Sequence, residues 1–266
     1  MKNSIKNWPK ISAFISDLDG VTYRGKKPIE SAVNAFRLWN DIGIPYAFVT
    51  NNSTKSAEEF SSKLNAMNIP ADPKKIITSS AVAAQKLKKM LKPKSRVMVI
   101  GEKALVEAIA ECNFTIADEN VDAVITGLDR SFTHKKLAKA QEALLKGALF
   151  VGTNPDFMLP KDDGFEPGAG SILKAIEFAS GGIKPIIIGK PNPDLVLKAL
   201  SVLGTEPSST FMLGDQIQTD IMAGKAAGLK TIRVQTGVIE KGPFTISPDF
   251  DIENLESIPL EAFAKK

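Results

Sequence analysis

Short runs of apolar and β-branched residues alternate with longer helical patterns along almost the whole chain. The predicted strands cover residues 11–19, 46–51, 97–101, 123–127, 149–153, 185–189, 210–215 and 231–234. The helical patterns between them include residues 31–41, 56–67, 135–145, 193–203 and 219–227, and Thr54 and Thr133 are predicted N-caps of two of these helices. Such alternation is typical of parallel sheets with helices on both faces. We therefore predict an α/β fold with a doubly wound parallel sheet.

The composition narrows the class of protein. Of the 266 residues, 43% are hydrophobic and 24% are charged, which is ordinary for a globular chain and excludes collagen-like and largely disordered proteins. The single cysteine cannot close an internal disulfide, and the single histidine excludes multi-histidine metal sites. No apolar run reaches the roughly eighteen residues of a membrane span, and the N-terminus lacks a signal-peptide pattern. We therefore expect a cytoplasmic protein that does not bind membranes.

The charge gives little reason to expect a nucleic-acid partner. Lysine and arginine number 34 against 30 acidic residues, so the formal net charge is +4. The densest basic stretch, residues 86–96, contains no aromatic side chain. Nucleic-acid surfaces usually combine such charge with residues that stack on bases or read them. A solvated helix end explains the stretch, and weak steering of anionic substrates is the alternative.

Four of the predicted strands end in polar residues. These residues are Asp17 and Asp19, Thr50 and Asn51, Lys190 after Gly189, and Asp215 followed by Asp220. Ligands of an open parallel sheet bind outside the carboxyl ends of its strands, so we expect the four clusters to meet in one crevice. The interval between the second and third clusters has strands and helices of its own. The sequence therefore predicts a core domain of residues 1–78 and 185–266, with a smaller α/β cap domain inserted at residues 79–184.

These residue types together favour phosphoryl chemistry. Carboxylates gathered in one crevice repel each other unless a cation lies among them, and oxygen ligands of low number suggest Mg²⁺. Lys190 adds a positive charge, while Thr50 and Asn51 add hydroxyl and amide donors for a phosphoryl group. A carboxylate can also act as the nucleophile of phosphoryl transfer. Asp17 is the candidate nucleophile, and Asp19 is the candidate general acid and base.

The four clusters carry a family resemblance. Asp17-Leu18-Asp19-Gly20-Val21, Thr50-Asn51-Asn52-Ser53, Gly189-Lys190-Pro191, and Gly214-Asp215 with Thr219-Asp220-Ile221 resemble the four motifs of the haloacid dehalogenase superfamily. Within it, the chain is similar to NagD-type, 4-nitrophenylphosphatase-like phosphatases with a large α/β cap. Cap sequences such as Thr153-Asn154-Pro155-Asp156 also resemble this family. The similarity covers almost the whole chain and implies a Rossmann-like core with an inserted cap.

The resemblance implies a role for each matched residue. The implied metal ligands for Mg²⁺ are Asp17, the backbone carbonyl of Asp19, Asp215 and Asp220, the last directly or through a further partner. Asp17 is also the implied nucleophile, Asp19 the acid and base, and Thr50, the Asn51 amide and Lys190 the phosphoryl-binding groups. Asn154 and Asp156 are predicted substrate contacts, although a turn at Asn-Pro-Asp explains them as well. Gln216 departs from the family, which often has arginine there.

The predicted function is Mg²⁺-dependent hydrolysis of a small phosphorylated metabolite, such as a nucleotide or sugar phosphate. A protein of the same fold that senses or binds phosphate without turnover is the first alternative. A carbon–halogen hydrolase is the second, although it would leave Asp19 and Asp215 without a purpose. The resemblance also implies a homodimer formed through the cap. His134 stands at a predicted helix start and is expected to be solvated rather than catalytic.

Overall fold

The computed structural model describes residues 8–161, 164–238, 240 and 242–263. By internal contacts the chain divides into two compact units. The core unit comprises Met1–Val49, Ser61–Ile76 and Val196–Lys266, and the cap unit comprises Thr50–Phe60 and Ile77–Leu195. The domain limits predicted from the sequence, 1–78, 79–184 and 185–266, remain a prediction. The α/β class with parallel sheets is confirmed.

A six-stranded sheet organises the core unit. Its order is β15-β14-β13-β1-β4-β5, and the neighbours from β15 through β4 pair in parallel. The bounds are β1 Ala13–Ser16, β4 Tyr46–Thr50, β5 Ile76–Thr78, β13 Thr210–Gly214, β14 Lys230–Val234 and β15 Phe250–Ile252. The strands predicted at residues 11–19, 46–51, 210–215 and 231–234 are therefore confirmed. The sequence analysis missed the two short edge strands β5 and β15.

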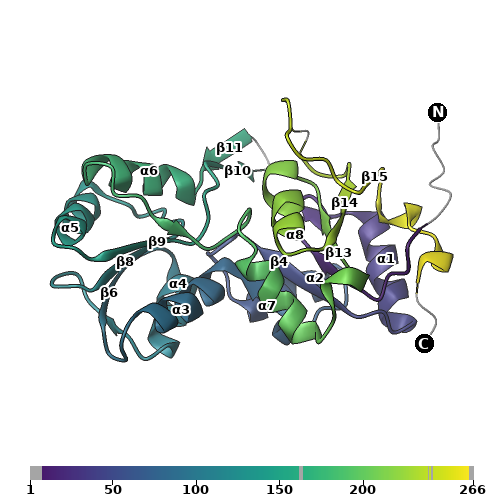
Figure 1. The fold of residues 1–266 in the computed structure, drawn as a ribbon, viewed down its shortest axis with the longest axis horizontal. Coiled ribbons are helices and arrows are strands. Elements are labelled where there is room, and N and C mark those ends of the chain that lie inside the picture. The colour runs from purple at the N-terminus through teal and green to yellow at the C-terminus, as the bar shows by residue number, and fades with distance from the viewer. Residues whose placement is uncertain (1–7, 162–163, 239, 241, 264–266) are drawn as a thin grey trace. The chain divides into compact units, whose positions relative to one another are not determined.

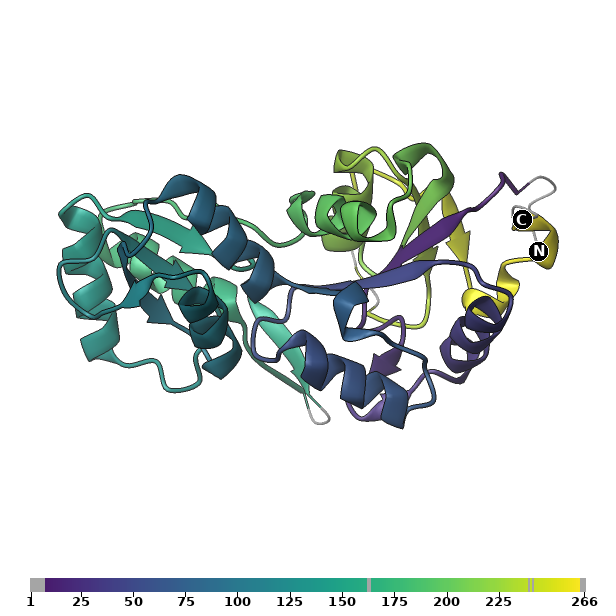
Figure 2. The same ribbon diagram turned by 90° about the horizontal axis from the view of Figure 1, so that it is seen from below.

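Continuous apolar runs explain the central strands. Every residue of β1, β4 and β13 is buried, as expected for strands covered on both faces. Helix α1 (Glu30–Asp41) buries Val33, Phe36 and Trp39 along one stripe. The Trp39 ring stacks on Phe14 of β1 with 4.1 Å between the ring centroids. Figure 2 shows α1, in dark blue, on one side of this sheet and the green helices α7 (Asp194–Leu203) and α8 (Met222–Ala226) on the other.

Local signals fix several helix ends. Helix α2 (Ala57–Ala66) begins after a capping box in which Ser56 and Glu59 each accept a hydrogen bond from the other's backbone N–H. The predicted N-cap Thr54 was therefore wrong, because Ser56 stands three residues before a glutamate and Thr54 does not. Thr133 caps α5 (His134–Leu145) as predicted. Within the described residues, no helix combines the length and apolar character needed to cross a membrane.

Short elements complete the core unit. A two-stranded ribbon pairs β2 (Tyr23–Arg24) with β3 (Lys27–Pro28) directly after the first acidic motif. A π-helical turn, Ile217–Ile221, leads into α8. Single 3₁₀ turns lie at Pro73–Lys75, Pro207–Ser209, Leu255–Ser257 and Leu260–Ala262. The ribbon and the π-helical turn come after strands that an aspartate directly follows, Asp17 after β1 and Asp215 after β13.

A five-stranded parallel sheet organises the cap unit. Its order is β12-β9-β8-β6-β7, with bounds β6 Arg96–Ile100, β7 Thr115–Ile116, β8 Ala123–Thr126, β9 Leu149–Gly152 and β12 Ile186–Ile187. An antiparallel hairpin of β10 (Met158–Lys161) and β11 (Gly164–Pro167) follows β9. In Figure 1, α5 and α6 (Ala169–Ala179) lie on one face of the sheet, and α3 (Ser79–Met90) and α4 (Lys103–Glu111) lie on the other.

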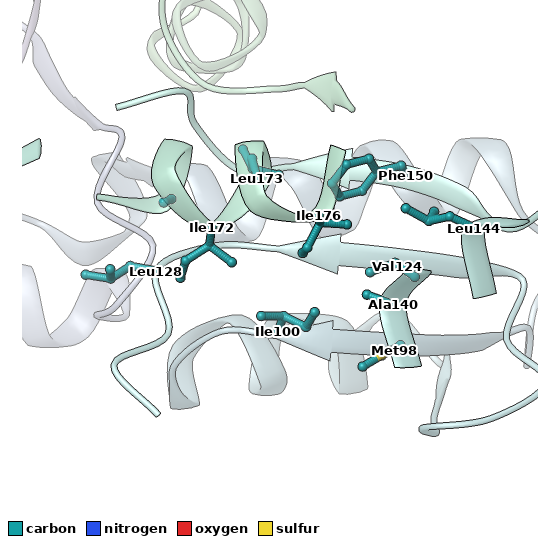
Figure 3. Close-up of a cluster of buried hydrophobic side chains, with 11 residues drawn as sticks. Met98, Ile100, Val124, Leu128, Ala140, Leu144, Phe150, Ile172, Leu173 and Ile176 are labelled. Atoms are coloured by element: carbon teal, nitrogen blue, oxygen red, sulfur yellow. The ribbon is translucent and has the colours of Figure 1, made fainter. Parts of the chain in front are cut away.

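The cap unit has its own hydrophobic core. Figure 3 shows Ile172, Leu173 and Ile176 of α6 packed beside Val124 of β8 and Phe150 of β9. These five side chains are 8% exposed or less. The apolar residues of α6 recur at helical spacing, so one face of the helix covers the sheet. A separate buried cluster of this kind is what an inserted domain requires.

The strand predicted at residues 185–189 lies in a different sheet from the one expected. The sequence analysis placed it in the second core segment, but β12 pairs in parallel with β9 of the cap unit, with Ile186 opposite Val151. Only two residues of β12 join this ladder. A strand this short has no side-chain pattern that selects its neighbour, so the tertiary structure decides which strand it pairs with.

Candidate active site

Three buried carboxylates form an acid centre in the core unit. Asp17 follows β1 directly, Asp215 follows β13, and Asp220 lies in the π-helical turn. One carboxylate oxygen from each lies within 4.8 Å of the others. Their exposed fractions are 7%, 2% and 1%. The adjacent strands β1 and β13 pair Ser16 with Leu213, so their carboxyl ends bring the first two acids together.

Backbone N–H groups hold two of these acids in place. Val238 N–H donates to Asp215 Oδ2 at 2.7 Å. Asp220 Oδ2 accepts from the backbone N–H groups of Asp215 and Gln216 at 3.2 and 3.1 Å. Asp220 therefore stabilises the turn that carries Asp215 and also belongs to the acid centre.

On one side of the acid centre, the backbone at Gly20 packs directly against the Asp215 carboxylate. Gly20 adopts a φ of +83°, and a Cβ added there would overlap the Asp215 carboxylate. Glycine at position 20 thus serves both the left-handed turn and the close approach. This turn carries the chain from Asp17 into the β2–β3 ribbon.

The donor set of the acid centre suits a hard divalent cation. Three carboxylates that lie this close and are this buried repel one another strongly unless a cation offsets their charge. All three offer oxygen atoms, which Mg²⁺ and Ca²⁺ prefer. The arrangement therefore fits the metal site expected from the sequence. The backbone carbonyl of Asp19 remains a predicted fourth ligand.

The Asp19 side chain lies beside this centre on the turn after β1. It is partly exposed, and its Oδ2 accepts a hydrogen bond from the Tyr23 hydroxyl at 3.2 Å. Burial raises the pKa of Tyr23, and the charges of Asp19 and Asp17 raise it further. The phenol therefore stays protonated and stays a donor. The sequence analysis missed Tyr23, and its only signal was an aromatic residue four positions after an acid.

A second group of strand-end residues lies in the cap unit and forms an amide network of Asn51, Asn154, Asp156 and the Lys190 backbone. The Asn51 amide nitrogen donates to both oxygens of Asp156 at 3.2 Å and to the Lys190 carbonyl at 3.0 Å. The Lys190 N–H donates to Asn51 Oδ1 at 2.8 Å. Asn154 donates to Asp156 Oδ2 at 2.9 Å. Residues that the sequence places 139 positions apart are thus joined directly.

The amide network uses the polar atoms of the Asn51 side chain. Both its oxygen and its nitrogen bond to protein groups. Asp156 accepts from two side-chain amides, which makes it a structural anchor as well as a predicted substrate contact. A Cβ at Gly189 would overlap the Thr153 carbonyl and the Asn51 side chain. This packing requires glycine before Lys190, which is itself buried.

The rest of the second motif is ordered by its own side chains. Thr50 is the last residue of β4 and is 2% exposed. Its hydroxyl accepts from the Asn52 N–H at 3.1 Å, and Asn52 Oδ1 accepts from the N–H and hydroxyl of Thr54. Ser53 Oγ accepts from the Leu128 N–H at 3.4 Å. These bonds fix the backbone that follows Thr50.

The structure thus gathers the predicted residues in two groups, each within one unit. Asp17, Asp215 and Asp220 meet in the core unit, and Asn51, Asn154, Asp156 and Lys190 meet in the cap unit. His134 is exposed, as expected. Besides Tyr23, the sequence analysis missed Glu240, whose carboxylate accepts from the N–H groups of Ile217 and Gln218 at the start of the π-helical turn.

Comparisons with known proteins show the family of the chain. Residues 14–115 match the family model described as haloacid dehalogenase-like hydrolase, and residues 187–258 match one described as HAD-hydrolase-like. The 5'-nucleotidase YutF of Bacillus subtilis (strain 168) is 41% identical over 232 residues, which cover 87% of this chain and 90% of that protein. An acid sugar phosphatase of Staphylococcus aureus (strain MRSA252) is 42% identical over 227 residues, which cover 85% and 87%.

A solved structure is similar over nearly the full length. The crystal structure of a double mutant of the thermostable NPPase from Geobacillus stearothermophilus aligns with a TM-score of 0.88 and 39% sequence identity. The alignment covers 94% of this chain and 99% of that one. The segments matched by the two family models contain Asp17, Asp19, Lys190, Asp215 and Asp220.

Proposed function

Because this chain belongs to the haloacid dehalogenase-like hydrolases and is a phosphatase, we propose that it hydrolyses small phosphomonoesters through a phosphorylated Asp17. The acid centre is the observation that supports this proposal most strongly. Asp17 lies at the end of β1 with Asp215 and Asp220 beside it, all three buried. A nucleophilic carboxylate needs such a setting, because a phosphate dianion approaches it only when positive charge offsets the repulsion.

In the first half-reaction, an oxygen of Asp17 attacks the phosphorus of the ester. The bond from phosphorus to the leaving oxygen breaks, and that oxygen takes the proton of the Asp19 carboxyl group. The products are an aspartyl phosphate on Asp17 and a free alcohol. The Asp19 side chain is partly exposed, so the leaving oxygen and later a water molecule can reach it.

In the second half-reaction, Asp19 is a carboxylate and accepts a proton from water. The water oxygen bonds to phosphorus, the bond from phosphorus to Asp17 breaks, and inorganic phosphate leaves. Asp17 returns as a carboxylate and Asp19 returns in its protonated form, so the cycle closes without another reactant.

Asp17, Asp215 and Asp220 would hold a divalent cation, together with the carbonyl of Asp19. We assign Mg²⁺, because the ligands are hard oxygen atoms and few in number. The ion would offset the charge of the carboxylates and of the phosphoryl oxygens. We assign the Thr50 hydroxyl, the Asn51 backbone N–H and the Lys190 ammonium to the phosphoryl group. The bonds within the amide network support this, because they leave the Asn51 backbone N–H as the amide suited to that group.

We propose a small phosphorylated metabolite as the substrate, in the class of nucleotides or sugar phosphates. The names of two relatives support that class, since one is a 5'-nucleotidase and another an acid sugar phosphatase. Asn154 and Asp156 remain proposed substrate contacts. A cytoplasmic location and a homodimer formed through the cap remain predictions of the sequence.

Phosphate release from a panel of phosphomonoesters tests this function directly. The panel holds nucleoside monophosphates, sugar phosphates and 4-nitrophenyl phosphate, each with Mg²⁺ and with EDTA. Release that requires Mg²⁺ and is strongest on one class is the expected result. Lack of release from every member would contradict the proposal and favour a phosphate-sensing protein. Release of halide from a haloacid in EDTA would favour the carbon–halogen hydrolase.

A further inference from the structure

The turn after Asp19 folds a buried tyrosine back onto that acid. Gly20 N–H donates to the Tyr23 carbonyl at 2.9 Å, and Thr22 N–H donates to the Leu18 carbonyl at 2.8 Å. These bonds close the loop so that residues 19 and 23 form an isolated bridge. The Tyr23 side chain is 0% exposed. The loop therefore holds the phenol in a fixed position over the turn that carries Asp19.

Two contacts orient the phenol. Its hydroxyl donates to Asp19 Oδ2 at 3.2 Å. The ammonium of Lys63, on α2, lies 3.3 Å from the centroid of the ring, a cation–π arrangement. Hydrogen bonds at catalytic groups are often long before substrate binds and shorten afterwards. The ring is thus held on its face by a cation and at its hydroxyl by the acid.

We propose that Tyr23 is a positioning residue that orients the Asp19 carboxyl group for proton transfer, an inference that rests on the proposed function. A hydroxyl that donates to Oδ2 fixes the rotation of the carboxyl group. The other oxygen, Oδ1, then carries the proton to the leaving oxygen in the first half-reaction and receives the proton of water in the second. Tyr23 itself exchanges no proton and forms no bond with the substrate.

Leaving groups of different basicity separate this role from a merely structural one. Phenyl phosphate and 4-nitrophenyl phosphate are similar in size, but phenol leaves poorly and depends on protonation, whereas 4-nitrophenol leaves well without it. The parameter kcat/KM reports the first half-reaction, which includes departure of the phenol. Poor orientation of Asp19 therefore lowers kcat/KM mainly for phenyl phosphate.

The test is Tyr23→Phe, which keeps the ring and removes only the hydroxyl. General acid catalysis contributes roughly 10²–10⁴-fold, so partial loss of orientation should lower kcat/KM for phenyl phosphate about tenfold and for 4-nitrophenyl phosphate less than about threefold. In an Asp19→Asn background, the same change should cost nothing further. Tyr46→Phe is the matched control, because the buried Tyr46 hydroxyl donates to the Pro70 carbonyl at 2.8 Å in the same unit. It should leave both substrates unchanged.

Other outcomes would overturn the inference. Equal losses on both substrates, with a lower midpoint of thermal unfolding than Tyr46→Phe, would show that Tyr23 only stabilises the fold. No loss on either substrate would show that Asp19 needs no such partner. Failure of the proposed function would look different, because the unmodified enzyme would then release no phosphate from either ester.

Discussion

The acid centre of the core unit and the amide network of the cap unit both lie at carboxyl ends of parallel strands, yet their charges are balanced in opposite ways. The acid centre brings three buried carboxylates within 4.8 Å of one another. In the amide network, the carboxylate of Asp156 accepts from two side-chain amides, and Asn51 bonds to the Lys190 backbone through both of its polar atoms. The acid centre gathers three carboxylates, although backbone N–H groups donate to two of them, whereas side-chain amides surround the single carboxylate of the amide network.

This difference predicts different consequences of substitution in the two groups. Buried like charges cost stability unless a cation offsets them, so the acid centre should gain stability when it binds the proposed cation. A network of paired amides and a carboxylate is stabilising by itself. Removing the charge of Asp17 should therefore abolish activity with little loss of stability. Changes in the amide network should lower both activity and stability.

The largest effect is expected for Asp17→Asn. The substitution keeps the shape of the side chain but removes the nucleophile, so kcat should fall by about 10³-fold or more. The thermal unfolding midpoint of the metal-free protein should not fall, because one of three neighbouring negative charges is gone. Steady-state turnover of 4-nitrophenyl phosphate and a thermal melt measure the two quantities.

Asp251→Asn is the matched control for this change. Asp251 is an acid of the same unit that pairs with Arg233 on the exposed side of β14 and β15. The activity of the Asp251→Asn variant should equal that of the unmodified protein. Undiminished turnover by Asp17→Asn would rule out the aspartyl phosphate, and a large drop in its unfolding midpoint would remove the contrast with the amide network.

The next largest effect is expected when the proposed metal is removed, and it should appear as a lower stability of the folded protein. A ligand that binds only the folded state at 100 times its dissociation constant stabilises it by about 2.7 kcal/mol. Adding Mg²⁺ to EDTA-treated protein should therefore raise the thermal unfolding midpoint. Asp215→Asn should abolish most of that shift, because Asp215 belongs to the acid centre.

Asn154→Ala provides the comparison for the metal titration. Asn154 belongs to the amide network, so its loss should lower the unfolding midpoint with and without Mg²⁺ and leave the shift between them unchanged. An equal loss of the Mg²⁺ shift in both variants would show that the ion does not bind at the acid centre.

Asp156→Asn should produce an intermediate effect. The new amide would bring a donor toward the Asn51 and Asn154 nitrogens that now donate to Asp156. Loss of charge-assisted hydrogen bonds in a partly buried site should cost about 2 kcal/mol of unfolding free energy, which urea denaturation measures. If Asp156 acts through Asn51 and Lys190, kcat/KM should fall by a similar factor for every substrate on the panel. A change confined to one substrate class would instead support its predicted role as a substrate contact.

The fold was largely predictable because its central strands are continuous apolar runs. The runs in β1 and β13 are buried on both faces. A strand buried in this way needs mainly apolar residues, and such a run can be recognised in the sequence. The position of β12 was not predictable, since two ladder residues carry no preference between sheets. The β10–β11 hairpin was missed because its residues show neither a buried run nor a clear alternation of apolar and polar side chains.

The acids of the candidate site were predictable for a related reason. Asp17 and Asp215 directly follow buried strands, and a charged residue there has few structural explanations. The contacts of Tyr23 and Asp156 were not predictable. The Tyr23 contact depends on the conformation of a turn, and the Asp156 contact joins residues more than a hundred positions apart. The spacing of residues along the chain does not predict which side-chain atoms form hydrogen bonds with each other. The bonding of Asn51 to Lys190 is therefore a finding of the structure alone.

Asp249, a carboxylate of the core unit outside the acid centre, sharpens the comparison, and its substitution should give the smallest effect. Asp249 accepts hydrogen bonds from the Thr231 hydroxyl and N–H, each at 2.8 Å, and from the Lys225 ammonium at 3.1 Å. Burial opposes the charged form of Asp249, but these donors outweigh it and lower the pKa of the carboxyl group. The proposed cation of the acid centre has no part in this stabilisation, because Lys225 supplies the positive charge.

The pH dependence of Asp249→Asn tests that contrast. Because the folded pKa lies below the unfolded value of about 3.9, the stabilisation is present above that value and is lost as pH falls through the folded pKa. The Asp249 side chain is 35% exposed, so solvent screening limits the expected loss at pH 7 to about 1 kcal/mol or less. Urea denaturation should show that loss near neutral pH and a smaller one in acid. An equal loss at both pH values would mean that the charge of Asp249 contributes nothing, and the ion pair and hydrogen bonds of Asp249 would then not explain the stability of this unit.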